Sequence, residues 1–507
     1  MAFIAQLDAF DLQVAAAAGV NQAMAARTTR LTNMTSAETF DLVVVGGGPA
    51  GTSAAAGAGL FGKRVALVEM TGILGGAGIN TGTIPSKSLR ETALVLSGWR
   101  SRRLYGVDLS LQREATIADF MGHASNVAAG ERGRTQARLD LRGVKQVRGQ
   151  AAFVDPHTVR VVADGSETVL RGERFLIATG SSPSRPPEFP FDDDRIHDSD
   201  EILQLAALPR KLAVVGAGVV GSEYASTFAA LGVKVHLIDG RDMLMPFLDE
   251  EISQGLAEAM AANGVQFHWN ERVAACDASS PGDVILTMSS GARLSCDGVL
   301  VCAGRQSNTA NLNLGAAGIT VGKRGLIPVN GHYQSVVLHI YAAGDVVGPP
   351  ALAATSIEQA RVAIVHALGS TFKTDLPSIL PTGIYTIPEA SMAGETEAAL
   401  IAKGVDFIVG RARYADLPRG EIIGDQTGFL KLIFRRDDMR LLGVHIMGEQ
   451  ATELVHVGLM ALLCGAGADL FNLACFNYPT LGDLYKYAAY DAFAQRAHPP
   501  WGVIGQT

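Results

Sequence analysis

Residues 41–70 read DLVVVGGGPAGTSAAAGAGLFGKRVALVEM, and their pattern predicts the architecture of this part of the chain. The apolar, β-branched run at 41–45 is typical of a buried parallel strand. It leads directly into glycines, then into a helix of small residues over 50–60, and then into a second strand that ends at Glu69. The pattern predicts one complete βαβ unit whose glycines form the turn between the first strand and the helix.

The glycines of this turn, Gly46, Gly48 and Gly51, have the spacing of a dinucleotide-binding fingerprint. The first allows a tight turn, the second lets the backbone approach a pyrophosphate, and the third lets the helix pack closely on the strand. The pyrophosphate then lies at the helix N-terminus. Glu69 is placed to accept hydrogen bonds from a ribose, so these residues predict a first dinucleotide site.

A second copy of the unit follows at residues 211–239, which read KLAVVGAGVVGSEYASTFAALGVKVHLID. Gly216, Gly218 and Gly221 repeat the spacing, and Asp239 ends the second strand of this copy. A single GxGxxG is weak evidence, because glycine-rich turns arise by chance. Two copies, each flanked by strands and each followed by an acidic residue, predict two Rossmann-like domains in an α/β protein.

The composition excludes several other classes of protein. With 507 residues, 48% hydrophobic and 18% charged, the chain is long and apolar enough for several globular domains. The net charge of −8 gives no reason to expect a nucleic acid or an anionic membrane as partner. The five cysteines form no CxxC pair and no Cys/His cluster, so we expect no metal site and a reduced, cytoplasmic setting.

Further motifs place the two units in a known order. ATG at 178–180 and YAAGD at 341–345 end apolar strands, and strand patterns at 429–434 and 441–448 with a helix around 451–464 indicate a C-terminal α+β domain. In this order the motifs resemble the pyridine nucleotide-disulfide oxidoreductase flavoproteins over about residues 40–495. The resemblance implies a glutathione reductase-like fold that binds FAD and NAD(P)(H) and forms a homodimer through its C-terminal domain.

The resemblance also implies which residues contact each cofactor. Those expected at FAD are Gly46, Gly48, Gly51, Glu69, Thr83, Lys87, Gly180 and Asp345. Those expected at NAD(P) are Gly216, Gly218, Gly221, Asp239 and Arg241. The implied domains are a flexible N-terminal extension (1–38), the two parts of the FAD domain (39–195 and 326–378), the NAD(P) domain (196–325) and the dimerisation domain (379–507).

The redox motif departs from the family pattern GGxCxxxxCxPSK. Residues 75–87 read GGAGINTGTIPSK, so Gly78 and Thr83 stand where the two cysteines belong. Without thiols there is no dithiol/disulfide relay, and disulfide reductase activity is excluded. Tyr478 stands where the disulfide-reducing members have a histidine, and a tyrosine of ordinary pKa, near 10, is a poor base at neutral pH.

Three strings resemble the soluble pyridine nucleotide transhydrogenase branch of this family: GTIPSK at 82–87, PTGIYTIPE at 381–389 and FNYPT at 476–480. The resemblance implies hydride transfer from NADPH to NAD⁺ through flavin N5. With one fingerprint left for nicotinamide nucleotides, both substrates use one site in turn, which predicts ping-pong kinetics. Members of this branch often keep the first cysteine, so Gly78 is a further departure.

Three residues are catalytic candidates by resemblance. Lys87 and Glu223 match the family's ion pair beside flavin N5. Tyr478 either lines the partner subunit's flavin pocket or packs in the dimer interface. At the second fingerprint, Asp239 favours a free ribose 2′-OH whereas Arg241 favours a 2′-phosphate. The two residues conflict, so the preference between NAD(H) and NADP(H) stays open.

Two other functions are compatible with the pattern. One is a thiol-free NAD(P)H-dependent reductase or oxidase that uses a quinone, oxygen or another small acceptor, since a fold does not fix a function. The other is an FAD-binding redox sensor or scaffold without turnover. Outside these motifs, His445, His456 and Cys475 lie in apolar sequence, and we expect them to be buried structural side chains.

Overall fold

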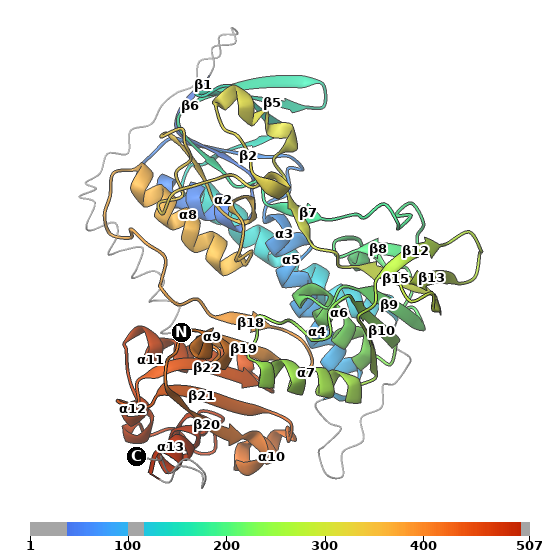
Figure 1. Ribbon diagram of the computed structural model, residues 1–507. Coiled ribbons are helices and arrows are strands. Elements are labelled where there is room, and N and C mark those ends of the chain that lie inside the picture. The colour runs from blue at the N-terminus through green and yellow to red at the C-terminus, as the bar shows by residue number, and fades with distance from the viewer. Residues whose placement is uncertain (1–37, 100–115, 498–507) are drawn as a thin grey trace. The chain divides into compact units, whose positions relative to one another are not determined.

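The computed structural model describes residues 38–99 and 116–497, so almost all of the predicted N-terminal extension lies outside the described residues. The chain divides into two compact units, each assembled from three segments (Figure 1). The first unit comprises Met1–Ile84, Asn126–Ser182 and Arg305–Leu376. The second comprises Pro85–Ser125, Pro183–Gly304 and Pro377–Thr507. The predicted boundaries at 195, 325 and 378 stay a prediction.

The first unit contains a seven-stranded sheet in the order β3-β2-β1-β6-β5-β4, with β17 beside β6. Neighbours in β3-β2-β1-β6 and the pair β6-β17 run parallel, whereas β4, β5 and the first half of β6 form an antiparallel meander. The strands are β1 (Glu38–Val45), β2 (Val65–Glu69), β3 (Lys145–Arg148), β4 (Gln150–Asp155), β5 (Thr158–Ala163), β6 (Ser166–Ile177) and β17 (Ile340–Ala342). The helices include α2 (Pro49–Leu60), α3 (Gly76–Asn80) and α8 (Ala353–Ala367).

The run at 41–45 is apolar throughout because β1 is covered on both faces. Successive side chains of a strand point to opposite faces. Leu42 and Val44 pack in the cluster that holds the alanines of α2 and α8, while Val43 and Val45 pack in the cluster that holds β4 and β5. Figure 1 shows α2 and α8 side by side on one face of this sheet. The helix predicted over 50–60 is therefore confirmed as α2.

The second unit contains the other parallel sheet, in the order β11-β10-β9-β15-β8. It follows the same plan, with a glycine turn between β9 and α6. The strands are β8 (Ile196–Asp198), β9 (Lys211–Val215), β10 (Lys234–Asp239), β11 (Val265–Trp269) and β15 (Gly298–Val301), and the helices are α6 (Val219–Ala230) and α7 (Glu250–Ala262). A three-stranded antiparallel sheet of β12 (Val273–Asp277), β13 (Val284–Met288) and β14 (Arg293–Cys296) follows β11. Helix α4 (Thr83–Leu96) begins in the first unit and continues in the second, and α5 (Ile117–Leu141) spans the boundary at 125.

The C-terminal part of the second unit is an antiparallel sheet in the order β18-β19-β22-β21-β20. Its strands are β18 (Thr382–Ile384), β19 (Ala390–Gly394), β20 (Phe407–Arg413), β21 (Phe429–Arg435) and β22 (Leu441–Met447). Its helices are α9 (Glu397–Ala402), α10 (Pro418–Ile423), α11 (Ala451–Leu463), α12 (Ala468–Leu473) and α13 (Asp483–Ala497). The predicted fold class, two Rossmann-like sheets and a C-terminal α+β domain, is confirmed.

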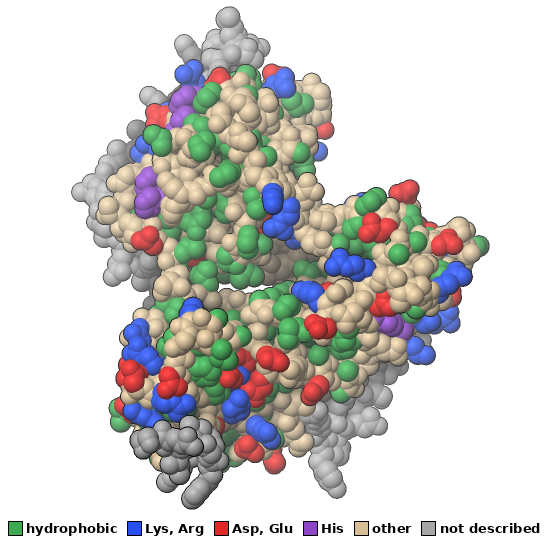
Figure 2. All heavy atoms as spheres, viewed as in Figure 1, with side chains coloured by type: hydrophobic (Ala, Val, Ile, Leu, Met, Phe, Trp, Pro, Cys, Tyr) green, Lys and Arg blue, Asp and Glu red, His purple; other side chains and the backbone are tan. Residues whose placement is uncertain are grey.

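The surface carries charges of both signs. On the face drawn in Figure 2, acidic and basic side chains are interspersed over the C-terminal part of the chain, and the described residues on this face form no extended basic patch of the kind that binds nucleic acid. Within residues 38–99 and 116–497, no helix combines the length and the apolar composition needed to cross a bilayer.

Candidate functional site

The first glycine turn leaves no room for side chains. Gly46 has a φ of 110°, and a Cβ on it would lie 2.2 Å from the carbonyl oxygen of Ala178. A Cβ on Gly51 would lie 1.8 Å from the carbonyl oxygen of Gly46. Gly48 caps α2 without any side-chain hydrogen bond, so the N–H groups of the first helical turn face outward free of a side-chain cap. These features fit a pyrophosphate at the helix N-terminus.

The acidic residue of this unit is held against the same turn. Oε2 of Glu69 accepts a hydrogen bond from the backbone N–H of Gly47 at 2.8 Å. Oε1 accepts from the backbone N–H and the hydroxyl of Thr71, each at 3.0 Å. The carboxylate is therefore fixed at the end of β2 beside the glycine turn, where a ribose hydroxyl would reach it.

The second glycine turn has the same construction. Gly216 has a φ of 106°, and its Cβ would lie 2.5 Å from the carbonyl oxygen of Cys302. A Cβ on Gly221 would lie 1.9 Å from the carbonyl oxygen of Gly216, and Gly218 caps α6 without a side-chain bond. Asp239 accepts the backbone N–H of the turn residue Ala217 at 2.7 Å. In the first copy, Glu69 accepts the corresponding N–H, that of Gly47.

The structure brings Lys87 and Glu223 together. Lys87 Nζ lies 2.6 Å from Glu223 Oε2, and the side chains are 26% and 8% exposed. The other carboxylate oxygen accepts the backbone N–H of Tyr385 at 3.0 Å. The ammonium also lies 4.9 Å from the centre of the Tyr385 ring, within the range of a cation–π contact. The pair is thus a partly buried charge centre fixed from two sides.

Tyr385 belongs to the string PTGIYTIPE, and further contacts hold this segment against α4 and α6, the helices that carry Lys87 and Glu223. Arg90, on α4 one turn after Lys87, donates to the carbonyl of Thr386 at 3.0 Å and pairs with Glu389 at 3.1 Å. Ser226, on α6, accepts the backbone N–H of Ile387 at 3.1 Å. Tyr385 and Arg90 are not among the predicted site residues, although the string that contains Tyr385 is one of the three that resemble the transhydrogenase branch.

The cysteine-free motif forms α3 and the first turn of α4. Thr83 is the first residue of α4, one turn before Lys87. Gly78 lies in α3, and a Cβ on it would come within 2.6 Å of Cγ of Pro49, the first residue of α2. The ring of Pro49 therefore fills the space that a side chain at position 78 would need.

Gly180 and Asp345 lie close together, although they are far apart in the sequence. Gly180 has a φ of 70° and accepts the backbone N–H of Asn308 at 3.0 Å. The next residue, Ser181, donates its hydroxyl to the carboxylate of Asp345. Arg305 Nε in turn donates to the Ser181 hydroxyl at 2.8 Å. The ATG and YAAGD motifs are therefore joined by hydrogen bonds in the first unit.

Tyr478 is separate from these groups within one chain. Its side chain is 75% exposed, and none of the hydrogen bonds among the described residues joins it to another predicted site residue. The expectation of burial is wrong for Cys475 and His456, which are exposed, because neighbouring apolar residues do not reveal which side of a segment faces solvent. It is confirmed for His445, whose Nε2 lies 2.9 Å from the carbonyl oxygen of Glu395.

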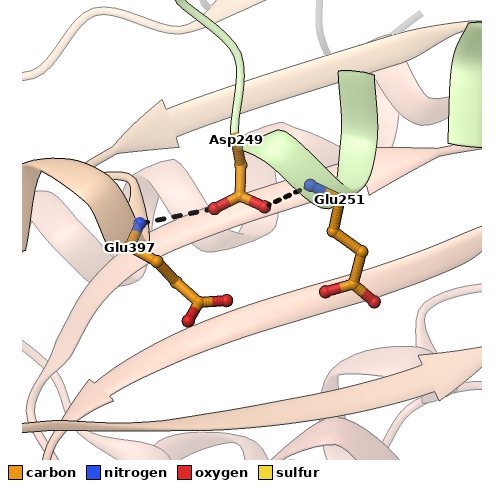
Figure 3. Close-up of side chains that lie close together, drawn as sticks. All are labelled: Asp249, Glu251 and Glu397. Atoms are coloured by element: carbon orange, nitrogen blue, oxygen red, sulfur yellow. Dashed lines mark hydrogen bonds between the residues drawn. The ribbon is translucent and has the colours of Figure 1, made fainter. Parts of the chain in front are cut away.

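Three carboxylates lie close enough together to suggest a cation site, those of Asp249, Glu251 and Glu397 (Figure 3). Asp249 accepts the backbone N–H groups of the other two at 3.2 and 3.3 Å. Lys431 already supplies a cation here: it is 2% exposed, with Nζ 2.6 Å from Asp249 and 3.1 Å from Glu251 and also paired with Glu397. Arg411 supplies a second one, 2.9 Å from Glu251 and 3.8 Å from Glu397. Burial opposes a charged lysine, but the hydrogen bonds to Asp249 and Glu397 outweigh it and raise the pKa of Lys431.

Comparison with known proteins gives a consistent result. The family described as "Pyridine nucleotide-disulphide oxidoreductase" matches residues 40–367, and its dimerisation domain matches residues 380–489. The chain is 44% identical over 455 residues to the soluble pyridine nucleotide transhydrogenase of Mycobacterium bovis, covering 89% of this chain and 97% of that protein. It is 40% identical to the protein of the same name from Yersinia enterocolitica, with the same coverage.

Solved structures give the same fold. LpdA from Mycobacterium tuberculosis is 27% identical with a TM-score of 0.82, covering 89% of this chain and 99% of that one. RclA, an HOCl-induced flavoprotein disulfide reductase from Escherichia coli, is 26% identical with a TM-score of 0.80, covering 89% of this chain and 99% of that one.

Proposed function

The chain belongs to the pyridine nucleotide-disulphide oxidoreductase family, and from this we propose that it is an FAD-dependent pyridine nucleotide transhydrogenase that moves hydride between NADPH and NAD⁺. The single observation that carries the proposal is the combination of two complete dinucleotide turns with a motif that has Gly78 and Thr83 in place of cysteines. Electrons that enter such a site have no thiol to pass to. The second dinucleotide turn offers a binding site for a nicotinamide nucleotide, which can accept the electrons instead.

The turn at 46–51 fits FAD. Its glycines leave the first N–H groups of α2 without a side-chain cap, and Glu69 lies at the end of β2 for the adenosine ribose. Asp345, held by Ser181, is proposed to bind on the flavin side. Bound FAD would supply the chemistry by accepting hydride at N5 and returning it to a second nicotinamide.

Lys87 and Glu223 are proposed to act on the flavin ring. A partly buried ammonium beside the ring would stabilise the negative charge that arrives with the hydride. Glu223 keeps the ammonium in place through the 2.6 Å contact, and the Tyr385 backbone keeps Glu223 in place. The same residues would act when NADPH reduces the flavin and when the reduced flavin passes hydride to NAD⁺. One nicotinamide-binding site is therefore sufficient for both nucleotides.

The test is a steady-state analysis of transfer from NADPH to an NAD⁺ analogue, with both concentrations varied. We expect parallel double-reciprocal lines, because one nicotinamide site requires the first nucleotide to leave before the second binds. Intersecting lines would mean that both nucleotides are bound at once and would overturn the one-site mechanism. Faster consumption of oxygen or a quinone than of the NAD⁺ analogue would favour a reductase or oxidase instead.

Gly51→Ala is expected to lower the FAD content of the purified protein. The new Cβ would lie 1.8 Å from the Gly46 carbonyl oxygen and would force the turn away from α2. Overpacking of this kind costs about 1–3 kcal/mol, which is about a fivefold to 150-fold loss of FAD affinity. The measurement is the ratio of flavin to protein absorbance after dialysis against limiting FAD.

Gly57→Ala is the matched control on the same helix. A Cβ at Gly57 meets nothing within 4 Å, so this variant should keep its FAD and unfold at the same temperature or slightly higher. Equal FAD loss in both variants would show that the effect comes from α2 as a whole rather than from the turn.

We also propose a homodimer formed through the C-terminal domain. Helices α11 to α13 and the segments between them leave large apolar side chains uncovered in one chain, with Leu473 84% and Met460 54% exposed. Patches of this kind mark interaction surfaces. A dimer would cover them and would give Tyr478 a partner subunit to contact. The other members of the patch are Val457, Leu463, Leu470, Tyr487 and Tyr490.

The thiols favour a reducing compartment. None of the five cysteines forms a disulfide bond, and Cys464 and Cys475 are exposed. Exposed free thiols persist where glutathione and thioredoxin keep them reduced. We therefore propose that the protein works in the cytoplasm.

A further inference from the structure

The two glycine turns differ in one respect, the partner of the acidic residue. Among the described residues, Glu69 is bonded only by backbone groups and the Thr71 hydroxyl. Asp239, by contrast, carries an arginine: Arg241 Nε donates to Oδ1 at 2.8 Å and its terminal nitrogen donates to Oδ2 at 2.7 Å. The backbone N–H of Arg241 adds a bond at 2.9 Å, and Ala217 adds one at 2.7 Å. Four donors occupy the four acceptor positions of the carboxylate.

With this arrangement, Arg241 can move away from Asp239 without leaving the carboxylate unbonded. Asp239 is only 9% exposed, but its two backbone donors remain whatever the guanidinium does. The Arg241 side chain is 45% exposed, so its guanidinium can turn into solvent, where water solvates the charge. Burial disfavours a charged Asp239, but the Arg241 and backbone bonds outweigh it and hold the pKa of Asp239 below its usual range. The carboxylate therefore stays ionised, and when the Arg241 guanidinium turns away, two of its acceptor positions become free for a ribose hydroxyl.

A second arginine lies against the same loop. The segment 270–272 follows β11 and runs beside Asp239–Arg241, because the N–H of Asn270 donates to the carbonyl of Arg241 at 3.0 Å and that of Glu271 donates to the carbonyl of Asp239 at 3.1 Å. This places the guanidinium of Arg272 over Gly240, where an ideal Cβ would lie 2.8 Å from Nε. The absence of a side chain at Gly240 makes the space for it.

The Arg272 guanidinium has no acidic partner among the residues that the structure describes. Its backbone is fixed by Ser289, whose hydroxyl accepts the Arg272 N–H at 3.2 Å. The carboxylate next to it in sequence, that of Glu271, is turned to Ser289 and Ser290 instead. An exposed guanidinium without a carboxylate partner in this part of the chain therefore lies over Gly240, the residue before Arg241, at the carboxyl end of β10, where nucleotides bind in folds of this type.

We propose that Arg272 and Arg241 together bind the 2′-phosphate of NADP(H), while Asp239 binds the free 2′-hydroxyl of NAD(H), so that one site accepts both nucleotides. This inference rests on the proposed function for its choice of ligand. A dianionic phosphate gains bidentate, charge-assisted bonds from two guanidinium groups, which exceed the exposed ion pair that Arg241 gives up. The conflict between Asp239 and Arg241 in the sequence is thereby resolved as a division of roles.

The test measures binding of the nucleotide fragments 2′,5′-ADP and 5′-AMP to the FAD-loaded protein by calorimetry. Arg272→Ala is expected to weaken 2′,5′-ADP about tenfold or more and to leave 5′-AMP unchanged. Gly240→Ala should have the same selectivity with a smaller effect, because its Cβ displaces the guanidinium while Arg272 remains. Arg293→Ala, which removes an exposed arginine on β14 of the same unit, should change neither affinity.

Equal weakening of both fragments, or no change in either, by Arg272→Ala would overturn the inference. So would a wild-type protein that binds 2′,5′-ADP no better than 5′-AMP. These outcomes are separate from failure of the proposed function, since fragment binding needs no turnover. A protein that shows the selective loss but transfers no hydride would refute the transhydrogenase activity and support the phosphate site.

Discussion

Lys87→Met is expected to slow the reduction of the flavin by NADPH about a hundredfold to a thousandfold, the usual cost of removing one group that stabilises charge in a transition state. Lys87 is only partly exposed and is held at 2.6 Å from Glu223 and over the Tyr385 ring. The measurement is anaerobic stopped flow, following loss of the oxidised flavin absorbance. Lys87→Arg keeps the charge and should recover part of the rate.

Glu223→Gln separates positioning from charge. The amide oxygen of glutamine still accepts the Tyr385 backbone N–H, but the ionic partner of Lys87 is lost. We expect a smaller loss of rate than in Lys87→Met, together with a shift in the pH profile of flavin reduction. Lys63→Met, at an exposed position in the first unit, is the control and should not change the rate. Wild-type rates in Lys87→Met would remove this residue from the proposed mechanism.

Lys431→Met is expected to lower the free energy of unfolding of the second unit by about 3–5 kcal/mol. The ammonium is 2% exposed and serves Asp249, Glu251 and Glu397 together. Without it, Asp249 loses its lysine partner, and the carboxylates of Glu251 and Glu397 keep the half-exposed Arg411 guanidinium at 2.9 and 3.8 Å. Unfolding by urea, followed by far-ultraviolet circular dichroism, measures the loss.

Two further variants serve as controls for Lys431→Met. Lys403→Met removes a lysine whose partner Glu395 is exposed, and such pairs contribute at most about 1 kcal/mol. The double variant Lys431→Met with Asp249→Asn removes the most buried charge of the cluster and keeps the cap of α7, since asparagine also caps helices. It should recover part of the lost stability. Equal losses in the Lys431 and Lys403 variants would contradict the burial argument.

The same cluster predicts a dependence on acid. Burial opposes the ionised form of Asp249, but the hydrogen bond from Lys431 and the neighbouring positive charges outweigh it and lower the pKa of Asp249. A carboxyl group whose pKa is lower in the folded protein stabilises it at pH values above its unfolded pKa, about 3.9. This contribution is lost as the pH falls below that value and through the lowered pKa of the folded state.

Local patterns in the sequence were sufficient for the two nucleotide turns. The glycines at 46–51 and 216–221 have to be adjacent to their strands and helices, so spacing alone predicts their geometry. Glu69 and Asp239 were predicted for the same reason, because each ends the strand that follows its turn. The pair of Lys87 and Glu223 needed the resemblance to a family, since 136 residues separate them.

Other features had no local signal. Arg272 reaches Gly240 only because the segment after β11 returns beside β10, and Lys431 sits in a strand pattern that does not reveal which acids lie opposite. The prediction that His456 is buried was wrong for a related reason. Helix α11 buries Val455 and Leu459 but exposes the face that carries His456, Val457 and Met460. That face is apolar and uncovered in one chain, so the rule that apolar neighbours mean burial does not hold there.

Pro49 lies beside Gly78, the residue that stands where the family members that depend on thiols have a cysteine. A rigid ring occupies the volume beside residue 78, within 2.6 Å of where a first side-chain atom would stand. A change of Gly78 to cysteine would press on the first residue of α2. A thiol at this position therefore requires Pro49 or the backbone of α3 to shift.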